Sequence, residues 1–108
     1  MANTFKLKTK KNVGVTTASV YVAPSSTTTV VIGITASNIS GNNINVGIGI
    51  TRASADDVHF MKNVPIPQGS SFEFMQGNKI VLETTDTLTA KSDVNNSLDV
   101  ALTIMEIT

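Results

Sequence analysis

The chain has 108 residues, with eight basic and eight acidic side chains, one histidine and no cysteine. A net charge of zero argues against a nucleic-acid-binding protein that relies on a basic surface, because phosphate contacts supply most of that affinity. The missing cysteines exclude disulfides and thiolate metal sites, and one histidine excludes a multi-histidine metal centre. No apolar run approaches the ~20 residues of a membrane span.

The first dozen residues form a basic segment that differs from the rest of the chain. No acidic residue precedes Asp56. We therefore divide the chain into an N-terminal basic arm or edge strand, residues 1–12, and a single β-sandwich domain, residues 13–108. Two interpretations of the arm stay open: a solvated tail or lysine-guarded edge strand, and an arm that lies on an acidic neighbour in an assembly. Its lysines and apolar residues are Phe5, Lys6, Leu7, Lys8, Lys10 and Lys11.

Beyond this arm, residues branched at Cβ dominate the sequence, and such residues favour a pleated sheet. Apolar residues occupy every second position in 44–50 and 98–104, which indicates strands with one buried face. Segments rich in Gly, Pro, Asn and Ser separate these runs and are typical of turns. The pattern predicts about eight short strands, at residues 19–22, 28–37, 44–50, 58–63, 72–75, 79–83, 87–90 and 98–107.

We expect an all-β fold, namely an antiparallel β-sandwich of the jelly-roll or immunoglobulin-like kind with an extended N-terminal arm. The outer face of the last predicted strand ends in apolar Met105 and Ile107. A neighbouring subunit is expected to cover these two side chains. The residues predicted to be buried between the two sheets are Ile32, Ile34, Val46, Ile48, Phe60, Phe72, Phe74, Val81, Leu88, Val100 and Leu102.

Few residues in the sequence can support chemistry. Asp56, Asp57 and His59 cluster, but they supply too few oxygens to hold a hard cation. The run Gly47-Ile48-Gly49 lacks the third glycine of a dinucleotide loop, and no helix follows it. Tyr21 is the one aromatic ring expected at the surface, and a rim position in the sandwich explains it as well as a sugar-stacking platform does. We therefore expect no catalytic residue, no cofactor and no metal, and predict that the protein is not an enzyme.

Five stretches of the chain are distinctive in combination. They are MANTFK at 1–6, VAPSSTTTVVIG at 22–33, KNVPIPQGSS at 62–71, GNKIVLE at 77–83 and MEIT at 105–108. Their order resembles the small virion structural proteins of tailed bacteriophages, particularly those that infect marine cyanobacteria. The resemblance runs from one end of the chain to the other and carries no catalytic motif.

This resemblance implies a non-enzymatic structural protein of the virion, assembled in the host cytoplasm. The favoured role is an accessory capsid decoration, or cement, protein that binds the major capsid protein lattice and stabilises it. The expected partners are copies of the chain itself, in a homo-oligomer such as a trimer, and the major capsid protein or other virion proteins. Direct binding to nucleic acid or membranes is not expected. Two alternatives stay open: a neck, tail or fibre-attachment component that forms a ring, and a receptor- or carbohydrate-binding module.

Three segments are predicted to contact partners: the basic arm, the outer face of the last strand, and a loop that contains two prolines. The prolines restrict the backbone that carries the apolar residues, so this loop loses little conformational entropy on binding. The alternative for this loop is a rigid connection that packs on its own sandwich. The predicted contact residues are Phe5, Lys6, Leu7, Lys8, Lys10, Lys11, Val64, Pro65, Ile66, Pro67, Met105 and Ile107.

Overall fold

The computed structural model describes residues 3–52, 56–73 and 79–108. In these ranges the chain forms strands and no helix, so the prediction of an all-β fold is confirmed. Accordingly, the described ranges contain no helix that is long and apolar enough to cross a membrane. The strands are β1 (Asn3–Val13), β2 (Ala18–Val22), β3 (Thr28–Asn38), β4 (Ile44–Thr51), β5 (Val58–Ile66), β6 (Ser71–Glu73), β7 (Ile80–Leu82), β8 (Thr87–Ser92) and β9 (Leu98–Ile107).

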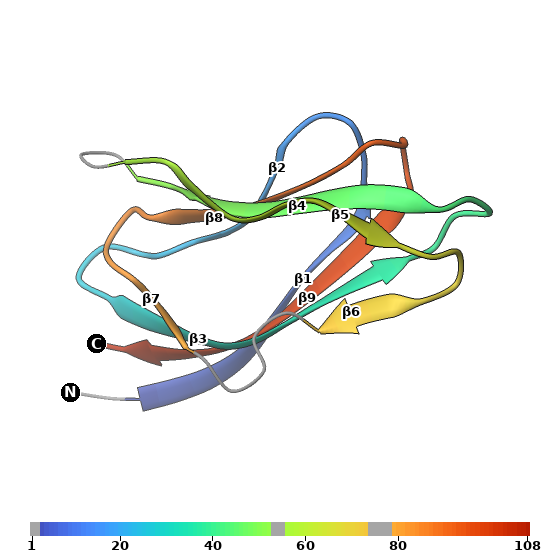
Figure 1. Ribbon diagram of the computed structural model, residues 1–108. Helices are drawn as coiled ribbons and strands as arrows, with labels where there is room; N and C mark the ends of the chain where they lie inside the picture. Colours follow the sequence, from blue (N-terminus) through green and yellow to red (C-terminus); the bar gives the residue numbers. More distant parts are fainter. Residues whose placement is uncertain (1–2, 53–55, 74–78) are drawn as a thin grey trace.

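The strands form two antiparallel sheets that stack as the layers of a sandwich (Figure 1). In the five-stranded sheet, β9 lies between β1 and β3, and β3 pairs with both β6 and β7 along its other edge. The four-stranded sheet has the order β2-β8-β4-β5. The antiparallel sandwich expected from the alternation of apolar and polar residues is therefore the observed architecture.

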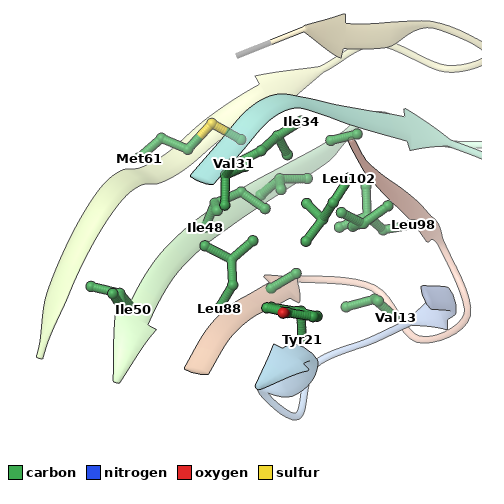
Figure 2. Packing of buried hydrophobic residues seen from close by; sticks show 14 of the residues in the cluster. Val13, Tyr21, Val31, Ile34, Ile48, Ile50, Met61, Leu88, Leu98 and Leu102 are labelled. Atoms are coloured by element: carbon green, nitrogen blue, oxygen red, sulfur yellow. The ribbon is translucent and has the colours of Figure 1, made fainter. Parts of the chain in front are cut away.

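The hydrophobic core lies between the two sheets and is built mainly from the inward faces of β3, β4, β8 and β9 (Figure 2). Ile34, Leu88 and Leu102 are fully buried, and Ile48 is 1% exposed. Each such side chain contributes roughly 1.5–3 kcal/mol of hydrophobic free energy on burial. The predicted core residues that are buried are Ile34, Val46, Ile48, Leu88, Val100 and Leu102.

The predicted core differs from the observed core at several positions, each with a local cause. The pairing of β3 with β9 shifts register between Val31 and Gly33, so Val31 is buried where Ile32 was expected. Val81 is 56% exposed, because it pairs with Val30 and its neighbour Leu82 is buried instead. Of the predicted aromatic core residues, Phe60 and Phe72 are half-buried at its margin, and Phe74 lies outside the described residues.

Asn38, at the end of β3, joins the two sheets through its carboxamide. Its Nδ2 donates to the Ile66 carbonyl of β5 at 3.0 Å and to the Asn42 carbonyl at 2.7 Å. Its Oδ1 accepts from the Ser40 amide at 2.9 Å. These bonds satisfy a side chain that is only 4% exposed, and they fix the connection between β3 and β4.

Candidate docking surface

An apolar row crosses the outer face of the five-stranded sheet. In an antiparallel pair, residues directly opposite one another point to the same face. Phe5 pairs with Met105, Met105 with Val30, and Val30 with Val81. These four residues come from β1, β9, β3 and β7, and they therefore form one continuous line across the sheet. Phe5 is 69% exposed and Val81 is 56% exposed.

Two further apolar residues widen this row. Leu7 lies two positions from Phe5 on the same face of β1 and is 68% exposed, and Ile107 lies two positions from Met105 on β9. We call the set of six the apolar strip; its residues are Phe5, Leu7, Val30, Val81, Met105 and Ile107. The structure therefore brings together four predicted contact residues, Phe5, Leu7, Met105 and Ile107, and adds Val30 and Val81, which the sequence interpretation did not assign to a surface.

The lysines of β1 lie on the other face of that strand. Lys6 pairs with Ile104, Lys8 with Leu102 and Lys10 with Val100, and these three partners point into the core. The predicted basic arm therefore separates its apolar and charged residues onto opposite faces of an edge strand. Lys11 lies where the pairing of β1 with β9 shifts register, between Lys10 and Val13.

A polar cluster, buried except for Lys6, links β1 to β9 and to the four-stranded sheet. The Lys6 ammonium lies 2.8 Å from the Glu106 carboxylate, and the Tyr21 hydroxyl donates to that carboxylate at 2.5 Å. The Thr29 hydroxyl lies 2.8 Å from the Tyr21 hydroxyl and completes the cluster. Tyr21 is 7% exposed, so the prediction of a surface ring at this position is wrong, since its hydroxyl has partners inside the sandwich.

The environment of this cluster shifts the pKa of both acidic groups. Burial, and then the hydrogen bond to Glu106, raises the pKa of Tyr21 to about 12. The Lys6 ammonium, followed by the Tyr21 hydroxyl, lowers the pKa of Glu106 below its ordinary value. Glu106 is therefore held as a carboxylate by donors from two other strands, which is a structural role.

The outer face of the four-stranded sheet carries a hollow of about 260 Å³. Gly47 and Gly49 of β4 form its floor, because neither residue has a side chain to fill it. A Cβ on Gly49 would lie 2.8 Å from the Val58 carbonyl oxygen, whereas a Cβ on Gly47 would make an ordinary 3.5 Å contact. The polar residues of its wall are Thr17, Asn45, His59, Lys62, Asn63, Thr89, Lys91, Ser92 and Asp93.

Two members of the cluster of Asp56, Asp57 and His59 have different surroundings. The Asp57 carboxylate accepts a hydrogen bond from the Arg52 amide at 3.1 Å, while His59 lies in the wall of the hollow. In the part of the chain that the structure describes, no group of three or more His, Asp or Glu side chains is placed to hold a metal ion.

The segment with two prolines lies at the C-terminal end of β5, which is an edge strand of the four-stranded sheet. Ile66 is 1% exposed and packs in the core, so its assignment as a partner contact is wrong. Val64 is half-buried and also packs against the core, while Pro65 and Pro67 are exposed. For the two apolar residues of this segment, packing on their own sandwich is the observed arrangement.

Comparisons with known proteins concern the fold. No protein-family model matches the sequence, and no curated protein sequence matches it significantly. The chain is similar to a solved structure from a study of Bacillus endospore appendages, which describes them as a novel family of disulfide-linked pili. The two chains are 13% identical, with a TM-score of 0.59, and the similarity covers 99% of this chain and 87% of the other. At this identity the comparison establishes a shared fold.

Proposed function

We propose that this protein is a non-enzymatic structural protein of a tailed-phage virion, and that it acts as an accessory capsid decoration protein. The observation that carries the proposal is the apolar row formed by Phe5, Met105, Val30 and Val81 on an open sheet face. Exposed apolar patches of this kind mark protein interaction sites in soluble proteins. The end-to-end sequence resemblance to virion structural proteins supplies the setting for that interaction.

Repetition makes a small patch effective. Covering apolar surface contributes about 25 cal/mol per Å², and a single strip therefore supports only modest affinity after the entropy of association is subtracted. A homo-oligomer on a repeating lattice binds through several strips at high effective concentration. A decoration protein therefore needs no reactive group, and its low proportion of charged residues, 15%, favours association.

The similar pilus protein provides an informative contrast. Its family is described as disulfide-linked, whereas this chain contains no cysteine. This chain therefore cannot form a corresponding disulfide. We propose that its assembly depends on noncovalent contacts through the apolar strip.

The proposal is tested on purified virions of the phage that encodes the chain. Quantitative mass spectrometry and a symmetric reconstruction should find on the order of hundreds of copies on the capsid surface, whereas a ring at the neck or tail holds about a dozen or fewer. The double variant Phe5→Asp with Leu7→Asp should be lost from the particle. Val58→Asp, at a 46% exposed residue of the other sheet, is the matched control and should be retained. Absence of the wild-type chain from the virion overturns the proposal.

The hollow on the four-stranded sheet favours a second candidate, a receptor- or carbohydrate-binding module. Its polar wall and side-chain-free floor suit a small hydrophilic ligand. Gly47→Val places a side chain in the floor, and a Cβ at this position makes an ordinary 3.5 Å contact with the Met61 carbonyl oxygen. Binding of the wild-type protein on a glycan array, lost in Gly47→Val, supports this candidate. An array on which the wild-type protein binds nothing removes it.

A further inference from the structure

The outer edge of β1 is open along a long strand. β1 spans Asn3–Val13 and pairs with β9 on one side, and among the described residues no strand pairs with its other side. An open edge presents unpaired backbone N–H and C=O groups at alternate residues, which is a template for another extended chain. The 11 residues of β1 exceed the typical strand length of about 5–6 residues, so the template is long.

The two faces of this edge differ in chemistry. Phe5 and Leu7 point to the outer face, and Lys6, Lys8 and Lys10 point to the inner face. Lys6 is paired with Glu106. Lys8 and Lys10 form no ion pair with any described residue, and both are near enough to the surface to meet a charge on a partner.

A second copy of β1 is a poor occupant of this edge. In the closed antiparallel arrangement, a two-fold axis perpendicular to the sheet keeps equivalent faces together. The lysines of one copy would then lie opposite the lysines of the other, and like charges opposite one another destabilise a strand pair. The same charges attract a strand that carries carboxylates on its inner face.

We infer that the open edge of β1 binds an extended segment of a partner protein by strand addition, and that this segment alternates acidic residues with apolar or β-branched residues. Its carboxylates lie beside Lys8 and Lys10, and its other side chains extend the row that begins at Phe5 and Leu7. Backbone hydrogen bonds supply affinity, and the lysines select the partner. This inference rests on the proposed function as a docking protein, and it identifies the chemistry of the partner.

The test uses the full-length protein and labelled peptides of about ten residues. One peptide alternates Glu with Val and Thr, and its matched counterpart has Lys in place of Glu. Fluorescence anisotropy should detect binding of the acidic peptide only. Its affinity should fall as ionic strength rises from 0.01 to 0.15 M, because the screening length shortens from ~30 Å to ~8 Å. Methylating those backbone nitrogens of the acidic peptide that face β1 should abolish its binding.

A charge-reversed variant makes the test specific to this edge. Lys8→Glu with Lys10→Glu should weaken binding of the acidic peptide by about tenfold and should create binding of the lysine peptide. The control reverses two exposed lysines of the four-stranded sheet, Lys62→Glu with Lys91→Glu, and should leave the preference for the acidic peptide unchanged. Thermal melts of both variants confirm that each is folded.

The remaining outcomes show whether strand addition or the proposed function fails. If neither peptide binds, or if binding survives methylation of the backbone nitrogens that face β1, strand addition is overturned and the lysines act only as guards against pairing. Such a result leaves attachment to the virion through the apolar strip intact. If the acidic peptide binds as expected but the chain is absent from virions, the proposed function fails while strand addition stands.

Discussion

The hydroxyl of Tyr21 donates a 2.5 Å hydrogen bond to the carboxylate of Glu106, and this bond joins the four-stranded sheet to the five-stranded sheet inside the sandwich. Lys6 reaches the same carboxylate from the edge strand β1. Glu106 of β9 therefore connects its own strand with β1 and β2. Its removal or protonation should weaken the attachment of β1, which carries the proposed docking residues Phe5 and Leu7.

Replacement of Tyr21 by phenylalanine should lower the free energy of unfolding by about 1–3 kcal/mol, because the variant leaves a buried carboxylate with one donor fewer. Urea unfolding followed by circular dichroism measures the change. Ser19→Ala, at an exposed position of the same strand, is the control and should leave the transition midpoint unchanged. An unchanged midpoint in Tyr21→Phe would show that the bond makes no net contribution to stability.

The same tyrosine should make the protein sensitive to alkaline pH. The pKa of Tyr21 is about 12 in the folded chain, against 10.0 for an unperturbed tyrosine. Above pH 10 the unfolded chain therefore loses a proton that the folded chain retains, and stability falls as the pH rises towards 12. Lysines titrate in the same range. The informative quantity is thus the stability difference between wild type and Tyr21→Phe, which should shrink as pH increases.

Glu106 should produce the opposite dependence on the acid side. Its pKa lies below its ordinary value of 4.5 in the folded chain, so its contribution to stability is complete above that value and is lost as pH falls through the folded pKa. Glu106→Gln should remove this part of the pH dependence. Glu73→Gln, an exposed carboxylate of β6, should retain it. Identical acid titration curves of stability for Glu106→Gln and the wild type would contradict the assignment.

The two glycines of β4 should differ sharply in their tolerance of alanine. A Cβ at position 49 would lie 2.8 Å from the Val58 carbonyl oxygen, and backbone must move to relieve that contact. We expect Gly49→Ala to lower the free energy of unfolding by about 1–3 kcal/mol, as overpacking does. Gly47→Ala, whose nearest Cβ contact would be at 3.5 Å, should leave the stability close to that of the wild type. Thermal melts of both variants measure the difference. Equal melting temperatures for the two variants would show that the strands separate easily here.

Ile48→Asp should abolish cooperative folding. Ile48 is 1% exposed at the centre of β4, and a carboxylate there has no partner to offset several kcal/mol of desolvation. Differential scanning calorimetry should find no unfolding transition. Thr51→Asp, at an exposed position of the same strand, should unfold cooperatively near the wild-type temperature. A normal transition in Ile48→Asp would mean that the register assigned to β4 is wrong.

Alternation of apolar and polar residues predicted the fold class because β3, β4 and β9 each bury one face. It worked best in β4 and β9, because the extra residues at the irregular pairings of these two strands lie on their neighbours β1, β3 and β5. It failed at Ile32 of β3, because the extra residue between Val31 and Gly33 moves the buried face from odd-numbered to even-numbered positions. Such a shift depends on how β9 pairs with β3, and the sequence of β3 alone does not predict that pairing.

The candidate docking surface was only partly predictable for the same reason. Phe5, Leu7, Met105 and Ile107 were identified from alternation within their own strands. Val30 and Val81 join them only through the registers that β3 makes with β9 and β7. Ile66 was misassigned, because the two prolines beside it indicate a stiff backbone but not the direction in which the side chain between them points.

The carboxamide of Asn38 has a consequence for producing the protein. Asn38-Ile39-Ser40 is an acceptor sequence for N-linked glycosylation, which requires an accessible amide nitrogen. Here that nitrogen donates to two carbonyls, and the residue is 4% exposed. In a secretory expression host the folded chain should stay unmodified at this site, whereas a chain that acquires the sugar before it folds cannot reach the sandwich described above.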